Sequence, residues 1–263
     1  MKVIPKKSLG QNFLIDNSII NSIVEAGNLS NEDNIIEIGP GTGNLTKKIL
    51  SKKPKKLFVI EKDSILAKEL KNKFDNKINI LNEDILKIDE RKLLHDRIIV
   101  FGNLPYNIST KILIKWIRYE NLNKKFKKFI LMFQKEVADR IISETNKKSY
   151  GRLTILSFWK MNVKKIIDVP SKSFFPIPKV DSSVLIFEPK NEFFKINNVK
   201  NLEKITNIFF NQRRKMINKT LKQIFKNTEK ISEKLSLNPS DRPQNLHPIK
   251  FFEICREYEK LIS

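Results

Sequence analysis

The feature that most restricts the fold of this sequence is the alternation of short β-branched runs with stretches of helical spacing over its first two thirds. The runs are residues 35–38, 57–60, 78–81, 98–101, 129–133 and 184–187. Between most of them apolar residues recur three or four positions apart, as at Leu66, Leu70 and Phe74. Strands that alternate with helices predict a mainly parallel sheet covered on both faces, which is a doubly wound α/β fold.

The pattern changes after residues 188–190, because 201–263 contains helical patterns and no convincing alternating strand. We therefore expect a sheet domain over residues 1–190 and a small all-α domain over 191–263. A chain of 263 residues, 40% hydrophobic, can bury one full core and one smaller unit. No run approaches the roughly 20 apolar residues needed to span a bilayer, and residues 1–16 lack the apolar stretch of a signal peptide. We expect a soluble cytoplasmic protein.

A glycine-rich turn directly follows the first of these strands. Residues 35–38 lead into Gly39, Gly41 and Gly43, and a helical pattern begins at Asn44. A strand, a glycine turn and a helix start allow backbone to approach a ligand closely. The G-x-G-x-G spacing differs from the dinucleotide fingerprint, and the Gly-Lys-Ser/Thr of a phosphate loop is absent. The alternative for this motif alone is a tight turn with no ligand.

Two acids stand at the ends of the next two strands. Glu61 follows residues 57–60, and Asp84 follows residues 78–83. A carboxylate at Glu61 can accept hydrogen bonds from both hydroxyls of a ribose, and Asp84 could accept from an adenine amino group. Taken alone, either acid is more typical of a solvated surface residue than of a binding site. Three successive strand ends that carry Gly, Glu and Asp predict one nucleoside pocket at the carboxyl edge of the sheet.

The most informative pentapeptide, Gly102-Asn103-Leu104-Pro105-Tyr106, ends the strand after Asp84. The exocyclic nitrogen of adenine is a poor nucleophile, because its lone pair is delocalised into the ring. The Asn103 side-chain oxygen and the Leu104 carbonyl can both accept from that amino group and favour a tetrahedral nitrogen. Pro105 stiffens the turn, and Tyr106 offers a flat face to an unstacked base. An ordinary Asn-x-Pro turn is the alternative.

A second aromatic and proline cluster lies at residues 173–182. Its prolines hold an extended loop, so that Phe174 could close the opposite side of the base. Equally, Phe174 and Phe175 could fill the core beneath that loop.

A basic segment opens the C-terminal domain. Residues 213–226 carry six basic side chains and no acid. These are Arg213, Arg214, Lys215, Lys219, Lys222 and Lys226. On one helix the four lysines would form a stripe opposite an apolar face made by Ile217, Leu221, Ile224 and Phe225. With a net charge of +22, the chain favours a polyanionic partner such as RNA, although a solvated lysine stripe is the alternative.

Taken together, these motifs resemble the ribosomal RNA small-subunit adenine dimethyltransferase family. Its hallmark start is similar to residues 7–16, and the match runs through 212–215 to 241–246, nearly the whole chain. The resemblance implies a Rossmann-like, seven-stranded, mainly parallel sheet. It implies that a pocket for S-adenosylmethionine is lined by Asn12, Leu14, Gly39, Glu61, Asp84 and Asn103, with residues 1–16 contacting cofactor and RNA.

The resemblance also implies that residues 103–106 and Phe174 hold the target adenine. The product would be N6,N6-dimethyladenosine at two adjacent adenosines near the 3′ end of 16S rRNA, in the immature 30S subunit. Phe175 departs from the family pattern, which often has a small polar residue there, so that either Phe could stack on the base. We expect a monomer.

Three other functions remain open on the sequence alone: methylation of large-subunit rRNA, methylation of DNA adenine, and a noncatalytic role in ribosome assembly. The one cysteine, Cys255, excludes an internal disulfide, and with two histidines the sequence has no cluster of metal-ligand spacing. We expect no metal, and we assign Cys255 to the core.

Overall fold

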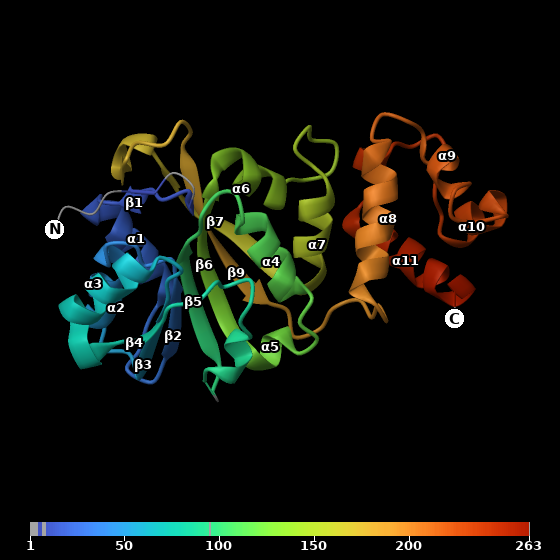
Figure 1. The fold of residues 1–263 in the computed structure, drawn as a ribbon. Helices are drawn as coiled ribbons and strands as arrows, with labels where there is room; N and C mark the ends of the chain where they lie inside the picture. Colours follow the sequence, from blue (N-terminus) through green and yellow to red (C-terminus); the bar gives the residue numbers. More distant parts are fainter. Residues whose placement is uncertain (1–4, 7–8, 95, 263) are drawn as a thin grey trace. The chain divides into compact units, whose positions relative to one another are not determined.

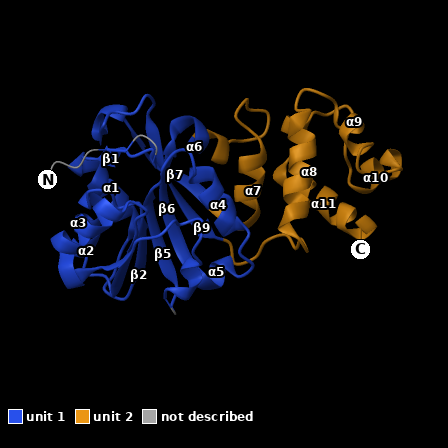
Figure 2. Cartoon of the chain, in the orientation of Figure 1, with its two compact units in different colours: residues 1–138, 163–189 blue, residues 139–162, 190–263 orange. Residues whose placement is uncertain are grey.

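A computed structural model describes residues 5–6, 9–94 and 96–262 of the chain. It divides into two compact units, Met1–Ala138 with Val163–Pro189 and Asp139–Asn162 with Lys190–Ser263 (Figure 2). Of the predicted N-terminal segment 1–16, residues 1–4, 7 and 8 lie outside the described part, as does His95. None of the helices among the described residues is long and apolar enough to cross a membrane.

The larger unit is built on one sheet of seven strands in the order β4-β3-β2-β5-β6-β9-β7 (Figure 1). The strands are β2 Asn34–Ile38, β3 Lys56–Ile60, β4 Asn79–Leu81, β5 Ile98–Asn103, β6 Phe126–Gln134, β7 Met161–Val169 and β9 Ser182–Pro189. The pairs β4–β3, β3–β2, β2–β5 and β5–β6 are parallel, whereas β9 runs antiparallel to β6. The predicted mainly parallel α/β sheet is therefore confirmed.

Helices follow the parallel strands and cover the sheet. They are α1 Asn17–Gly27, α2 Asn44–Ser51, α3 Ser64–Phe74, α4 Ser109–Ile117, α5 Leu122–Lys125 and α6 Lys135–Ile141. The short 3-10 helices of this unit are η2 Asp75–Lys77, η3 Glu90–Lys92 and η4 Ser171–Ser173, and a fourth, η5 Pro243–Asn245, belongs to the smaller unit. Asp16 starts α1 by accepting hydrogen bonds from the amides of Ser18 and Ile19.

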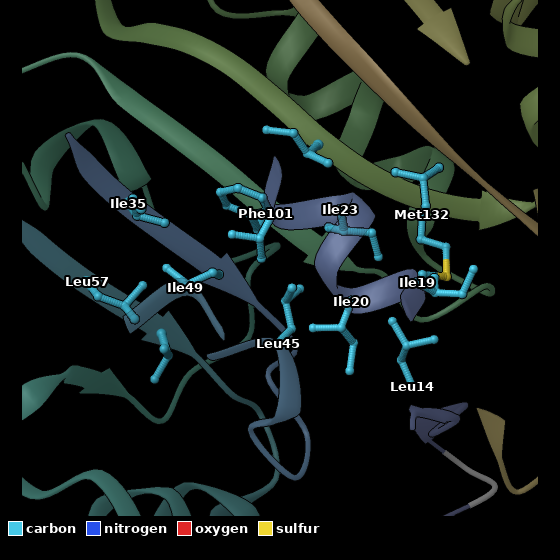
Figure 3. Packing of buried hydrophobic residues seen from close by; sticks show 14 of the residues in the cluster. Leu14, Ile19, Ile20, Ile23, Ile35, Leu45, Ile49, Leu57, Phe101 and Met132 are labelled. Atoms are coloured by element: carbon cyan, nitrogen blue, oxygen red, sulfur yellow. The ribbon is translucent and has the colours of Figure 1, made fainter. Parts of the chain in front are cut away.

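The core of this unit lies between the sheet and the first two helices. Figure 3 shows Ile20 and Ile23 of α1 packed with Ile49 of α2 near the strand residues Ile35 and Phe101. All five side chains are buried. Strand β2 is buried along its whole length, because parallel strands of this kind are covered on both faces. The sheet is thus a rigid support for the loops at its carboxyl edge.

A second, two-stranded sheet brings the N-terminal segment to the same edge. Strand β1 Phe13–Leu14 pairs antiparallel with β8 Phe174–Phe175, with Leu14 opposite Phe174. The carbonyl of Ser173 accepts a hydrogen bond from the amide of Ile15. These contacts join two segments that lie about 160 residues apart in the chain.

The smaller unit combines one helix from the middle of the chain with the helices of the C-terminal region. They are α7 Arg152–Lys160, α8 Val199–Asn211, α9 Ile217–Leu221, α10 Thr228–Lys234 and α11 Pro248–Ile262. Helices α7, α8 and α11 pack on one another, with the rings of Phe209 and Phe251 5.4 Å apart. Cys255 is fully buried there. The sequence had assigned residues 139–162 to the sheet domain, but α7 packs on α8 and α11, so this excursion belongs to the helical unit.

The single helix predicted over residues 213–226 is wrong. Helix α8 ends at Asn211, and the short α9 begins only at Ile217. The amide of Ile217 donates to the carbonyl of Asp241, and that of Asn218 to Pro239, instead of to residues one turn earlier. A long-range tie therefore interrupts the helix.

Candidate functional site

A cavity lies at the carboxyl edge of the sheet, beneath the N-terminal segment. Its wall contains most of the residues that the sequence singled out. These are Asn12, Leu14, Gly39, Gly41, Glu61, Asp84, Asn103, Leu104, Pro105 and Tyr106. The predicted residues Gly43 and Phe174 are not among the described residues that line it. The ends of β2, β3 and β5 and the loop after β4 thus meet around one space.

The glycine turn forms one wall of this cavity. Gly39, Gly41 and Gly43 all have positive φ angles, of 66°, 56° and 80°. A Cβ atom at Gly41 would lie 2.7 Å from the ring of Phe13. At Gly43 it would lie 2.6 Å from the ring of Phe74, so this glycine serves helix packing rather than the cavity. The prediction that Gly43 contacts the cofactor is not supported by its position.

Glu61 is tied to the turn by its own hydrogen bonds. One carboxylate oxygen accepts from the amide of Gly41 at 3.3 Å, and the other from the amide of Asp63 at 2.9 Å. Burial raises the pKa of Glu61, since its side chain is only slightly exposed. The carboxylate therefore stands at a fixed position on the cavity wall, at the end of β3.

Asp84 is held in the loop that follows β4. Its carboxylate accepts from the amide of Leu86 at 2.9 Å and pairs with the Lys62 ammonium at 3.0 Å. The backbone hydrogen bond from Leu86 is the largest of the effects that lower the pKa of Asp84. This side chain therefore remains an acceptor over the whole neutral range.

Glu37 is a cavity residue that the sequence reasoning missed. It is the next-to-last residue of the buried strand β2, is 1% exposed and lines the cavity. Its Oε2 atom has no hydrogen-bond partner among the described residues. Burial raises its pKa to about 8. The signal was present in the sequence as a single acid inside an apolar strand that runs into a glycine turn.

The Asn103–Tyr106 turn faces these acids across the cavity. The Asn103 amide nitrogen donates to the main-chain oxygen of Asn12 at 3.0 Å, which leaves the amide oxygen to accept from a ligand. The carbonyl of Pro105 accepts from the amides of Ile108 and Ser109 and closes the turn. The sequence had predicted this acceptor role for Asn103, but Asn12 entered only through the family resemblance.

Tyr106 is half-buried in the same wall. Its hydroxyl shares a 2.7 Å hydrogen bond with the Ser182 hydroxyl at the start of β9. Burial raises the pKa of Tyr106, so the phenol stays protonated at neutral pH. The bond to Ser182 fixes the ring beside the cavity.

The two phenylalanines of β8 point in opposite directions. Phe174 is 1% exposed and packs in the core cluster with Leu14 and Val184. Phe175 is 56% exposed. Alternate residues of a strand face opposite sides, and this explains the difference. The placement of Phe174 in the core does not support its predicted contact with the base, and leaves Phe175 as the accessible ring.

The basic side chains predicted to bind RNA separate into two groups. Arg214, Lys215, Lys219, Lys222 and Lys226 are exposed. Arg213 is half-buried and donates to the Gln244 side chain and to the carbonyl of Lys147. The apolar partners Ile217, Leu221 and Phe225 are buried. The exposed cations thus share one short segment although no continuous helix carries them.

Within the described part of the chain, no three His, Cys, Asp or Glu side chains gather in a way that could hold a metal ion. The chemistry of the cavity lining is that of amide and carboxylate acceptors beside backbone donors.

Comparisons with known proteins agree with this arrangement. A family model described as "Ribosomal RNA adenine dimethylase" matches residues 4–260. A relative from Pelagibacter ubique, named Ribosomal RNA small subunit methyltransferase A, is 56% identical over 99% of both chains. A protein of the same name from a Wolbachia of Brugia malayi is 45% identical over 92% of this chain and 93% of that one.

Solved structures give the same fold. A dimethyladenosine transferase from Plasmodium falciparum superposes with a TM-score of 0.79 at 27% identity, covering 94% of this chain and 98% of that one. The 23S rRNA methyltransferase ErmE superposes with a TM-score of 0.70 at 21% identity, over 94% of this chain and 100% of the other, and shows the fold alone.

Proposed function

Because this chain belongs to the ribosomal RNA adenine dimethylase family, we propose that it is an adenine dimethyltransferase of small-subunit rRNA. Its substrates would be S-adenosylmethionine and two adjacent adenosines near the 3′ end of 16S rRNA in the immature 30S subunit. The products would be N6,N6-dimethyladenosines. The observation that carries the proposal is the Asn103 amide, whose nitrogen is engaged by Asn12 and whose oxygen is left for an amino group at the cavity.

The residues present fit the methyl donor. S-adenosylmethionine carries a nucleoside, a sulfonium cation and an amino-acid end that includes an ammonium group, and the cavity offers acceptors for the nucleoside and for the ammonium group. Glu61 is suited to the ribose hydroxyls and Asp84 to the adenine amino group. The unpartnered Oε2 of Glu37 would be satisfied by the ammonium group, since a buried carboxylate is stabilised by an opposite charge. When bound, the donor supplies an electrophilic methyl group on a positively charged sulfur.

The chain's own residues prepare the acceptor nitrogen. In the first transfer the Asn103 oxygen and the Leu104 carbonyl accept from the two N6 hydrogens, and in the second transfer one of these oxygens accepts from the single hydrogen that remains; this draws the lone pair out of the ring. Tyr106, fixed by Ser182, presents its ring to the base. Methylation makes N6 cationic, so its proton passes readily to water and the mechanism needs no general base. Orientation and fixed dipoles then supply most of the rate enhancement.

The exposed cations of residues 214–226 are suited to the RNA backbone, since each neutralised phosphate releases counterions. Their spread over a turn and a short helix is suited to recognition of folded RNA by shape. We place the protein in the cytoplasm, where its substrate is assembled. We expect it to act as a monomer, with the cavity of the sheet unit as its active site.

The direct test is mass spectrometry of nucleosides from small subunits that lack the modification, incubated with this protein and S-adenosylmethionine. We expect N6,N6-dimethyladenosine, and primer extension should stop at two adjacent adenosines near the 3′ end of 16S rRNA. A stop of primer extension in large-subunit rRNA would instead indicate a large-subunit rRNA methyltransferase. Methylation of duplex DNA would indicate a DNA adenine methyltransferase. Donor binding without methyl transfer would indicate a noncatalytic assembly factor.

The Asn103→Ala variant tests whether the Asn103 amide oxygen binds the reacting amino group. Loss of one preorganised polar contact to the reacting group lowers kcat by about 100-fold to 1,000-fold in other enzymes, and we expect a fall of this size. Asn72→Ala on the exposed side of α3 is the matched control and should keep full activity. Near-normal turnover of a folded Asn103→Ala protein would remove Asn103 from the mechanism.

A further inference from the structure

A buried ionic cluster lies next to the cavity and plays no part in the mechanism described so far. Glu90 of η3 is 0% exposed. Its carboxylate accepts from the indole of Trp116 at 2.9 Å, the hydroxyl of Tyr119 at 2.7 Å and the ammonium of Lys115 at 2.9 Å. Burying a carboxylate is costly unless it is paired and hydrogen-bonded, and here it is both.

The Lys115 ammonium makes two further contacts, both to the loop after β4. It donates to the carbonyls of Ile85 at 2.6 Å and Ile88 at 2.5 Å. An ammonium group has three hydrogens, so these two carbonyls and Glu90 use its full donor capacity. Lys115 therefore holds the loop at both ends of its turn and fixes it to η3.

This loop carries one wall of the cavity. Asp84 and Ile85 both line it. Residues 82–89 form neither strand nor helix. The Asn82 side chain ties the start of this loop to the carbonyls of Glu61 and Lys62, whereas residues 85–88 lie beyond these contacts. The Asp84 carboxylate accepts from the amide of Leu86, and its carbonyl accepts from that of Lys87. These two bonds are local, whereas the pair with the Lys62 ammonium joins Asp84 to the end of β3. Among the contacts described here, Lys115 provides the long-range hydrogen bonds to the carbonyl of the cavity residue Ile85.

Lys115 also lies on the helix that follows the Asn103 turn. Helix α4 begins at Ser109, whose amide donates to the carbonyl of Pro105 within that turn. A rigid helix thus connects the acceptor turn to the Asp84–Ile85 wall. An apolar contact could hold a helix against a loop without a buried charge. A donor to two carbonyls, in contrast, fixes the direction of the peptide groups.

We propose that Lys115 is a positioning residue for the methyl donor: with Glu90 as its buried counter-ion, it sets the Asp84–Ile85 wall relative to the Asn103 turn. This inference rests on the proposed function, since it assumes that the cavity binds S-adenosylmethionine. It assigns no chemical step to Lys115. The role predicts an effect on donor binding that exceeds any effect on the methyl-transfer step.

The experiment measures binding of S-adenosylhomocysteine by calorimetry, and KM for S-adenosylmethionine and kcat on unmodified small subunits. For Lys115→Met we expect Kd and KM to rise about tenfold, the size of one lost charge-assisted hydrogen bond. We expect kcat at saturating donor to stay within about twofold by the same reasoning. Lys115→Arg keeps the charge and should restore most of the affinity. Lys111→Met, exposed on the same helix, is the control and should match the unchanged protein.

A second variant separates positioning from folding. Lys115→Met leaves Glu90 without its cation, whereas Lys115→Met with Glu90→Gln removes that buried charge as well. The double variant should regain thermal stability but not donor affinity, because the carbonyls of Ile85 and Ile88 still lack their donor. A double variant that recovers both, or a folded Lys115→Met with unchanged KM and Kd, would overturn the inference. If the unchanged protein itself fails to bind S-adenosylhomocysteine, the proposed function falls, and that result is visible without any variant.

Discussion

At the scale of single residues, Glu37 makes the chemistry of the cavity depend on pH. Its pKa is raised to about 8 by burial, so near neutral pH the carboxyl is mostly protonated in the unliganded protein. A cationic ligand binds best to the ionised form. The affinity for S-adenosylmethionine, relative to a Glu37→Gln variant, should therefore rise as pH increases from 7 to 9, by about tenfold if only the ionised form binds. Calorimetry at several pH values checks this, and parallel profiles for the two proteins would contradict it.

The same raised pKa affects folding in the opposite direction. A carboxyl whose pKa in the folded protein lies above its ordinary value of 4.5 contributes its full stabilisation of the fold below pH 4.5. This contribution is lost as pH rises through the folded pKa near 8. Between pH 5 and 8 the unchanged protein should lose stability relative to Glu37→Gln, as followed by chemical unfolding. At high pH, Glu37 thus raises the affinity for the donor but lowers the free energy of unfolding of the ligand-free protein.

The adjacent phenylalanines of β8 offer a matched pair of variants. Phe174→Ala should lower the free energy of unfolding by about 3–5 kcal/mol, because it leaves a cavity in the core. Phe175→Ala removes an exposed ring and should change it by less than about 0.5 kcal/mol. Urea unfolding of both variants measures the difference. Equal losses would contradict the opposite orientation of the two rings.

The residues that line the cavity could be grouped from the sequence because most of them stand at strand ends. Gly39, Glu61, Asp84 and Asn103 could be brought together in advance, since parallel strands end at one edge. Glu37 could not be assigned, because a carboxyl inside a strand gains its meaning only from burial. Phe174 was uncertain for a similar reason: which face of a two-residue strand turns inward depends on its pairing with residues 13 and 14.

At the scale of elements, the interruption between α8 and α9 has a measurable consequence. Met216 is exposed and has a φ angle of −61°, which proline also adopts. Met216→Pro should therefore change the free energy of unfolding by less than about 1 kcal/mol. Lys204→Pro, in the middle of α8, should cost about 3 kcal/mol or more. Thermal unfolding of both variants provides the measurement. A large loss with Met216→Pro would indicate a continuous helix.

Local sequence patterns predicted the strands of the sheet and the helices that follow them more accurately than they predicted the helices in the last third of the chain. The apolar runs of strands β2, β3 and β5 are stable only when they are buried inside the sheet. In residues 213–226 the helical spacing correctly predicted which side chains are buried, since Ile217 and Leu221 are buried and Lys219 and Lys222 are exposed. The backbone differs because the amide of Ile217 bonds to Asp241, a partner that no local pattern contains.

At the scale of the whole molecule, the net charge of +22 and the exposed cations imply binding that depends on salt. Lys219→Gln and Lys222→Gln should each weaken binding of small-subunit rRNA and reduce the slope of log affinity against log salt by about 0.7–0.9. Lys68→Gln, on the exposed side of α3, is the control of equal charge. Filter binding across a salt series gives the slopes. Identical slopes for all three variants would mean that residues 219 and 222 do not contact phosphate.

The discontinuous helical unit also has consequences during synthesis. Helix α7 leaves the ribosome before α8 and α11, the helices on which it packs, have been translated. Its buried residues Ile155 and Trp159 therefore remain exposed to solvent or to chaperones while the last seventy or so residues are added. A chain that ends near residue 190 and has left the ribosome would therefore display an apolar surface that the finished protein hides.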